Sequence, residues 1–261
     1  MSQNYSGRID PTKEEWTDSE WTELLKERYQ LASLFTTDSV VLDSCCGTGF
    51  GTINYIIPNA KYTVGFDICD SALKNFGKTE RFEFLVMDGR RIELDTGSFD
   101  VVLSLDAIEH FNQPDGLQYL FQLARVCKKE GLLIGTTPLV IDPALIPTYL
   151  EWNNFHLFMY TWDVLDSTLR RVFQHVQIHD IYSPVCPYFL FLCSNTPFRS
   201  CSSGQHLGKY LIDNRPMFSR SKQSNYLTWA SMLIRRNKFI KAFSLIIKSS
   251  LIKATGIIYH Q

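Results

Sequence analysis

The chain has 261 residues, of which 45% are hydrophobic and 20% are charged, and its formal net charge is −1. This length suffices for one large globular domain, and no apolar run approaches the ~18 residues that a membrane span needs. The N-terminus lacks the basic start and apolar core of a signal peptide. Seven cysteines without a C-x-x-C pair favour free thiols in a reducing compartment, so we expect a cytoplasmic protein.

The first part of the chain predicts a helix followed by alternating strands and helices. Residues 12–35 have the apolar periodicity of a helix. Strands are expected at residues 40–43, 62–67, 82–87, 99–104 and 132–136, and helices at 51–57, 70–76, 114–128 and 162–171. The strands are continuous apolar runs, which indicates a parallel sheet that is buried on both faces.

The pattern changes after Phe173. The segments HVQIHDIYS and YFLFLCS, at residues 175–183 and 188–194, predict two strands that form a hairpin at the edge of the sheet. Residues 197–222 read as irregular and residues 224–258 as helical. We therefore predict an α/β fold with a doubly wound, mostly parallel seven-stranded sheet. It divides into an N-terminal helical cover (1–38), a core (39–196) and a C-terminal helical extension (197–261).

The C-terminal extension is basic. Residues 214–261 carry nine Lys or Arg and no acid, which leaves 17 of the 26 cations and all 27 acids for residues 1–213. On a helix, most of these cations lie opposite an apolar stripe, which favours packing on the domain or on a second subunit. Peripheral contact with an anionic membrane is the alternative. Binding of nucleic acid is less favoured because no aromatic stacking platform accompanies the charge.

The segment VLDSCCGTGFGT (residues 41–52) forms a glycine-rich turn after the first strand. Glycines here permit close approach of the backbone to a ligand. The Gly-Lys-Ser/Thr of a phosphate loop is absent, and the dinucleotide pattern fails because residue 52 is Thr. Asp43 before the turn would repel a pyrophosphate but suits a ligand with an amino group and a positive sulfur.

Two further acids end the next two strands. Asp67 stands where a carboxylate can accept both ribose hydroxyls, and Asp88 where it can accept the exocyclic amine of adenine. Three acids at successive strand ends, without a base in the turn, describe a site for a cationic nucleoside. S-adenosylmethionine fits this description.

Six segments in order carry a resemblance to a known family. They are ERYQLASLF, VLDSCCGTGFGT, VGFDICDSAL, FLVMDGRRI, FDVVLSLDAIEHF and LARVCKKEGLLIGTTP, with NNFHLFMYTWDVLDSTL following as a lid segment. The chain resembles the class I S-adenosylmethionine-dependent methyltransferases, in particular the type 11 group often found with polysaccharide biosynthesis. The resemblance covers residues 27 to 194 and implies a Rossmann-like methyltransferase fold.

The resemblance also implies roles for individual residues. It assigns Asp43, Gly47 and Gly49 to the methionine end of the cofactor, Asp67 to the ribose, and Asp88 to the adenine. Residues expected to line the cofactor are Cys45, Ile68, Gly89 and Leu105. Cys45 departs from the family, which usually has glycine there, and Asn154 replaces a proline of the lid.

The two adjacent cysteines, Cys45 and Cys46, are interpreted as structural. Adjacent cysteines rarely form a disulfide, and no His or second Cys pair lies nearby to complete a zinc site. We expect Cys46 to be a small buried hydrophobe and Cys45 to form a wall of the pocket.

The fourth strand ends in D-x-x-E-H. Relatives with E-x-x-E-H bind a divalent metal there, so Asp106, Glu109 and His110, with His156, form an alternative metal site. We expect no metal, because the Glu-His pair is common in the group without one. His110 or His156 is a candidate general base. Methyl transfer from a sulfonium depends mainly on alignment.

Six aromatic residues flank the expected opening of the site, and most of them are expected to pack the lid: Trp16, Trp21, Tyr29, Tyr149, Trp152 and Phe155.

We therefore predict an S-adenosylmethionine-dependent methyltransferase that acts on a small-molecule or glycan acceptor, with oxygen as the nucleophile. The alternatives are a metal-dependent RNA-end or quinone-type O-methyltransferase that uses Asp106, Glu109 and His110, and a non-catalytic partner protein with the same fold. A nicotinamide oxidoreductase is less favoured because the third glycine is missing and Asp43 is misplaced for it. The acceptor itself cannot be deduced from these motifs.

Overall fold

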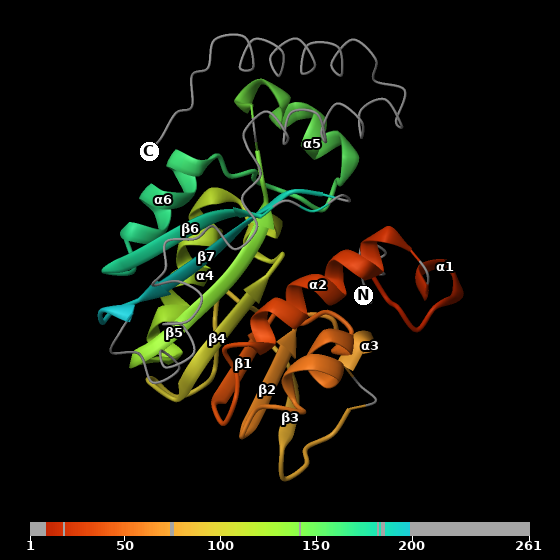
Figure 1. Cartoon of the computed structure of the whole chain (residues 1–261), viewed down its shortest axis with the longest axis vertical. Coiled ribbons are helices and arrows are strands. Elements are labelled where there is room, and N and C mark those ends of the chain that lie inside the picture. The colour runs from red at the N-terminus through yellow and green to blue at the C-terminus, as the bar shows by residue number, and fades with distance from the viewer. Residues whose placement is uncertain are drawn as a thin grey trace.

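The computed structural model describes residues 9–17, 19–73, 76–140, 142–181, 183 and 186–198. In these residues seven strands form one sheet in the order β3-β2-β1-β4-β5-β7-β6 (Figure 1). The strands are β1 Val40–Ser44, β2 Tyr62–Asp67, β3 Phe82–Val86, β4 Phe99–Leu105, β5 Cys127–Pro138, β6 His175–Ile181 and β7 Tyr188–Ser194. Strands β1 to β5 pair in parallel, and β7 runs antiparallel to both β5 and β6. The predicted doubly wound sheet with an edge hairpin is confirmed.

Helices cover both faces of this sheet. They are α1 Glu14–Thr17, α2 Glu20–Ser33, α3 Asp70–Leu73, α4 Gln113–Val126, α5 Ile146–Trp152 and α6 Trp162–Arg170, with shorter turns at Thr52–Ile56, Ile108–His110 and Pro143–Leu145. Adjacent residues of β1 point to opposite faces: Val41 packs in one core with Leu24 of α2, and Leu42 in the other with Leu120 of α4 and Leu165 of α6. This alternation explains why the strand is apolar throughout.

The helix predicted for residues 12–35 begins later than expected. Ser19 interrupts it, because its side-chain oxygen accepts the Thr22 amide at 3.1 Å and caps α2. Capping oxygens of this kind satisfy an amide that has no partner within the helix. The N-terminal cover is therefore two helices, α1 and α2.

Two further boundaries differ from the predictions. Strand β5 begins at Cys127, because α4 ends at Val126 and the backbone of Cys127 is already extended; Lys128 then pairs with Asp100 of β4 at 2.7 Å. Helix α5 was not predicted, and Pro147 lies in its first turn, a position where a helix tolerates proline.

The predicted basic helix of the C-terminal extension lies outside the described residues. Among the helices that are described, none has both the length and the hydropathy required to span a membrane. The described helices that bear on the site are α2, which lies against β4 and the turn at Thr52–Ile56, and α4, which lies against β5.

Candidate active site

Three of the predicted site acids lie at or just after the carboxyl ends of neighbouring strands, along one side of the sheet. Asp43 lies near the end of β1, Asp67 ends β2, and Asp88 comes two residues after β3. Because these strands are parallel and adjacent in the order β3-β2-β1, their carboxyl ends meet. Open α/β sheets bind ligands at this edge, where the chain order reverses between β1 and β4.

The glycine-rich turn is tied to the end of β2. The amide of Gly47 donates to Oδ2 of Asp67 at 2.9 Å, and the amide of Cys69 donates to Oδ1 at 2.9 Å. Gly47 and Gly49 have φ values of 60° and 73°, in the left-handed region that glycine adopts without cost. Asp67 therefore orders the turn by accepting one amide on each carboxylate oxygen.

Cys45 adopts the same left-handed region, with φ of 55°. For a residue with a side chain this conformation costs roughly 1–2 kcal/mol, which is why glycine is usual at such a position. Cys46 is buried, and burial raises the pKa of its thiol well above the usual value, so it is a poor nucleophile. Neither cysteine forms a disulfide, and the structural interpretation of Cys46 agrees with this burial.

Asp43 is fully buried, and one of its carboxylate oxygens accepts two hydrogen bonds. The hydroxyl groups of Tyr29 and Thr52 donate to its Oδ2 at 3.0 and 2.5 Å. Its Oδ1 is buried, and none of the residues that the structure describes donates to it. Burial raises the pKa of Asp43 to about 7, against the lowering effect of the two hydroxyl donors, and the charge of Asp67 adds to the rise. A buried carboxylate oxygen of this kind is a strong acceptor for a cationic donor.

Asp88 is paired with Arg90. The guanidinium Nη2 lies 2.6 Å from Oδ2 of Asp88, and Nη1 lies 3.2 Å from Asp115 at the start of α4. The hydrogen bonds from Arg90 lower the pKa of Asp88, so this carboxylate stays ionised. Beside this strand end the side chain of Ile68 is 46% exposed, which leaves an apolar face uncovered, and Gly89 is buried.

The turn after β4 brings a cation next to two acids. Leu105 ends the strand and is buried. Asp106 follows with φ of 49°, and its carboxylate pairs with the buried guanidinium of Arg28 from α2. Glu109 is fully buried and accepts the Thr137 hydroxyl at 2.9 Å through Oε2, while its Oε1 has no hydrogen-bond partner among the described residues. Burial raises the pKa of Glu109.

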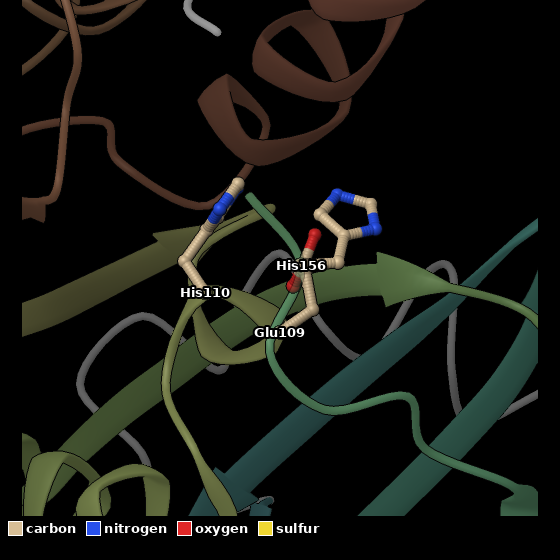
Figure 2. A group of neighbouring side chains, drawn as sticks. All are labelled: Glu109, His110 and His156. Carbon is tan, nitrogen blue, oxygen red and sulfur yellow. The ribbon is translucent and has the colours of Figure 1, made fainter. Parts of the chain in front are cut away.

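His110 and His156 approach each other from different segments, the turn after β4 and the segment after α5 (Figure 2). Their ring centroids are 5.0 Å apart. Nδ1 of His110 lies 3.0 Å from the carbonyl oxygen of Phe155. Because a carbonyl only accepts, Nδ1 of His110 is the donor of this pair, and in the neutral form of this exposed ring the lone pair is on Nε2.

The environment of His156 is different. The amide of Asn153 lies 2.9 Å from Nε2 of His156, and its orientation is fixed because its Oδ1 accepts the Phe155 amide at 3.0 Å. Nε2 of His156 therefore accepts, and its lone pair is occupied. Burial, reinforced by the charges of His110 and Arg28, lowers the pKa of His156 to about 3, so this imidazole is neutral at physiological pH.

A metal site at this turn fits only in part. Ligand atoms of Glu109, His110 and His156 lie within 4.8 Å of one another. Asp106, the fourth residue of the alternative set, is instead paired with Arg28, and His156 has no free lone pair in this arrangement. The same guanidinium acts on both Glu109 and His156, and its positive charge opposes a cation there. These residues do not form a complete metal site as they are arranged.

Three residues of the site were not identified as functional from the sequence: Arg28, Tyr29 and Thr52. Tyr29 was expected to pack, and it does so with its ring, but its hydroxyl reaches Asp43. Thr52 replaces the third glycine of the dinucleotide pattern and donates to the same acid. Arg28 and Tyr29 belong to the ERY segment, which was recognised as a family motif. The motif does not indicate which strands their side chains contact.

Comparison with known proteins matches one part of the chain to a family and finds several relatives. Residues 41–131 match a family described as methyltransferase domain. A tRNA U34 carboxymethyltransferase of Aeromonas hydrophila is 25% identical over 165 residues, which are 60% of this chain and 48% of that protein. One of Histophilus somni is 27% identical over 182 residues, 64% of this chain and 54% of that protein. The chain spans about half the length of these curated relatives.

Solved structures share the fold. A Pyrococcus horikoshii OT3 protein matches with a TM-score of 0.55 at 19% identity, over 72% of this chain and 97% of that one. The 1,6-didemethyltoxoflavin-N1-methyltransferase of Burkholderia thailandensis, solved with S-adenosylhomocysteine, matches with a TM-score of 0.53 at 18% identity, over 72% and 84%. The seven-stranded sheet has the fold of these structures, and residues 41–131 within it match the methyltransferase domain family.

Proposed function

We propose that the chain binds S-adenosylmethionine and transfers its methyl group to a small-molecule or glycan acceptor, at oxygen. The observation that carries this proposal is the buried Oδ1 of Asp43, which has no partner among the described residues. It lies on the strand next to the one that ends in Asp67. Burying a carboxylate without a partner is costly, and a ligand with an ammonium group would relieve that cost.

The other predicted residues then have separate roles. The carboxylate of Asp67 would accept the ribose hydroxyls, and that of Asp88 the exocyclic amine of adenine. The exposed side chain of Ile68 would pack on the adenine ring, with Gly89 beside it. Cys45 and Leu105, at the ends of β1 and β4, would line the reactive end together with Gly47 and Gly49. The spacing of strands in a sheet suits an elongated nucleoside laid across their ends.

The chemistry of transfer needs alignment and the removal of a proton. When bound, the cofactor would supply a methyl group on a positive sulfur; the acceptor oxygen would form a bond to the methyl carbon in line with the C–S bond, and the sulfur would leave as the neutral thioether. Nε2 of His110 is the base that we propose for the acceptor hydroxyl, because its lone pair is free and Nδ1 is fixed by the Phe155 carbonyl. His156 is not suited to this role, since its acceptor nitrogen is occupied. The lid is held at this turn because the amides of Leu157 and Phe158 donate to the Glu109 carbonyl at 2.8 and 3.2 Å.

We propose that the reaction is metal-independent. This rests on the pairing of Asp106 with Arg28 and on the orientation of Asn153 toward His156, both of which would have to be broken to complete four ligands. Titration of the protein with Mn²⁺, followed by electron paramagnetic resonance, tests this. We expect no stoichiometric binding; one tight ion, lost in His156→Gln, would reverse the conclusion.

The names of the curated relatives favour a second candidate, an RNA acceptor. Those proteins are tRNA U34 carboxymethyltransferases. In this chain residues 1–213 carry 17 cations against 27 acids, so phosphate contacts would depend on the nine cations of residues 214–261. Binding to phosphates releases counterions and weakens steeply with salt. The two candidates therefore differ in the dependence of acceptor binding on salt.

Methyl transfer to fractionated acceptors distinguishes these candidates. Labelled S-adenosylmethionine would be incubated with the full chain and with lysate pools of glycans, nucleotide sugars, RNA and protein. We expect label in a glycan or small-molecule pool. Label in RNA, lost at high salt, would establish the second candidate, and product mass distinguishes a methyl from a carboxymethyl group. Cofactor binding without transfer to any pool would support a non-catalytic role. The control is Asp67→Ala, which lacks the carboxylate proposed to accept the ribose hydroxyls of the cofactor.

A further inference from the structure

The hydroxyl of Tyr29 crosses from the N-terminal cover to the cofactor edge of the sheet. Tyr29 lies on α2, is buried, and donates to Oδ2 of Asp43 at 3.0 Å. Thr52, at the start of the helical turn after the glycines, donates to the same Oδ2 at 2.5 Å. Two donors from different elements thus converge on one carboxylate oxygen and fix the plane of the carboxylate.

The other oxygen is left for a ligand. Oδ1 of Asp43 is buried and has no hydrogen-bond partner within the described part of the chain. We propose that Tyr29 is a positioning residue that holds the Asp43 carboxylate so that Oδ1 faces the ammonium group at the methionine end of the cofactor. This inference rests on the proposed function and adds to it a residue that determines how that end of the cofactor is recognised.

Gly51 supports this assignment independently. A Cβ atom on Gly51 would lie 2.2 Å from two ring carbons of Tyr29, far inside van der Waals contact. The glycine is therefore required by the ring of Tyr29 and not by a left-handed backbone, since its φ is −66°. The third glycine of the turn, which lies one residue early for a dinucleotide pattern, makes room for this tyrosine.

Tyr29 is not needed simply to attach α2. Its two preceding residues provide separate anchors: Glu27 accepts the Tyr188 hydroxyl at 3.0 Å, and Arg28 pairs with Asp106 while its guanidinium lies 4.7 Å from the centre of the Tyr188 ring. Burial also raises the pKa of Tyr29 well above its usual value, so the hydroxyl remains a donor. Tyr188→Phe is thus a matched control, because it removes a hydroxyl–carboxylate hydrogen bond of equal length, which Glu27 of the same helix accepts.

Two ligands separate positioning from general stability. S-adenosylhomocysteine carries the amino-acid end, whereas methylthioadenosine has the same nucleoside without it. Calorimetry on the full chain would measure both affinities in the wild type, Tyr29→Phe, Gly51→Ala and Tyr188→Phe. We expect Tyr29→Phe to weaken S-adenosylhomocysteine about 10-fold, as for loss of one hydrogen bond to a charged group, and to leave methylthioadenosine unchanged. Gly51→Ala, which displaces the ring, should show the same selectivity.

Other outcomes would overturn the inference. Equal weakening of both ligands, or the same selective loss in Tyr188→Phe, would mean that the tyrosine acts only through the fold. Unchanged affinity of Tyr29→Phe for S-adenosylhomocysteine would show that Asp43 needs no positioning. A wild type that binds neither ligand would instead refute the proposed function, and with it this inference.

Discussion

The buried carboxylate of Asp43 should make the free energy of unfolding of the ligand-free protein depend on pH. The substitution that tests this is Asp43→Asn, which keeps the shape of the side chain and removes its charge. The neutral amide still offers one oxygen to the hydroxyl groups of Tyr29 and Thr52. The variant therefore isolates the cost of an ionised group in this position.

The size of the effect follows from the pKa, which burial raises from 3.8 to about 7. Because the folded-state pKa lies above the unfolded one, the contribution of Asp43 to stability is fully present below the unfolded value and is lost as pH rises through the folded one. The total amounts to about 4 kcal/mol, of which about 2–3 kcal/mol falls between pH 5 and pH 8. A cofactor ammonium group would offset this cost on binding.

Urea unfolding at constant ionic strength, followed by circular dichroism at several pH values in that range, measures this. We expect Asp43→Asn to gain about 2–3 kcal/mol relative to the wild type as pH rises from 5 to 8, on top of a constant offset from altered hydrogen bonds. Asp88→Asn is the control: pairing with Arg90 lowers the pKa of Asp88, so its effect appears only at more acidic pH. A difference between Asp43→Asn and the wild type that stays constant over the range would refute the reasoning.

Four further substitutions test the site. Cys45→Gly should raise the free energy of unfolding by about 0.5–1 kcal/mol, because it relieves the left-handed φ at the expense of chain entropy; a lower urea midpoint would mean that packing of the thiol outweighs that relief. Asp67→Ala should weaken binding of S-adenosylhomocysteine by at least ~1–3 kcal/mol, and unchanged affinity in calorimetry would contradict the ribose assignment. His110→Asn should lower kcat by about 100-fold or more if this residue is the base, whereas His156→Asn should change kcat much less; the reverse order in single-turnover rates would reassign the base.

The sequence by itself determined the sheet and the end of the sheet at which the three acids meet. Continuous apolar runs such as those of β1 and β4 can only be buried on both faces, and this gives a parallel sheet with helices on each side. The acids Asp43, Asp67 and Asp88 then follow neighbouring strands, so parallel pairing brings them to one edge without any knowledge of tertiary packing. Local chemistry was sufficient because each acid is placed by its own strand.

The details that depend on contacts between distant segments were decided only by the tertiary structure. Arg28 and Tyr29 are adjacent on α2, yet one reaches Asp106 after β4 and the other Asp43 of β1. The docking angle of the helix sets these contacts, and no periodicity encodes it. The same holds for the choice between His110 and His156, which differ in burial and in the carbonyl or amide group that contacts each ring. The sequence motifs indicated that both histidines would be near the site, and only the packing around each ring showed which nitrogen atoms are already hydrogen-bonded.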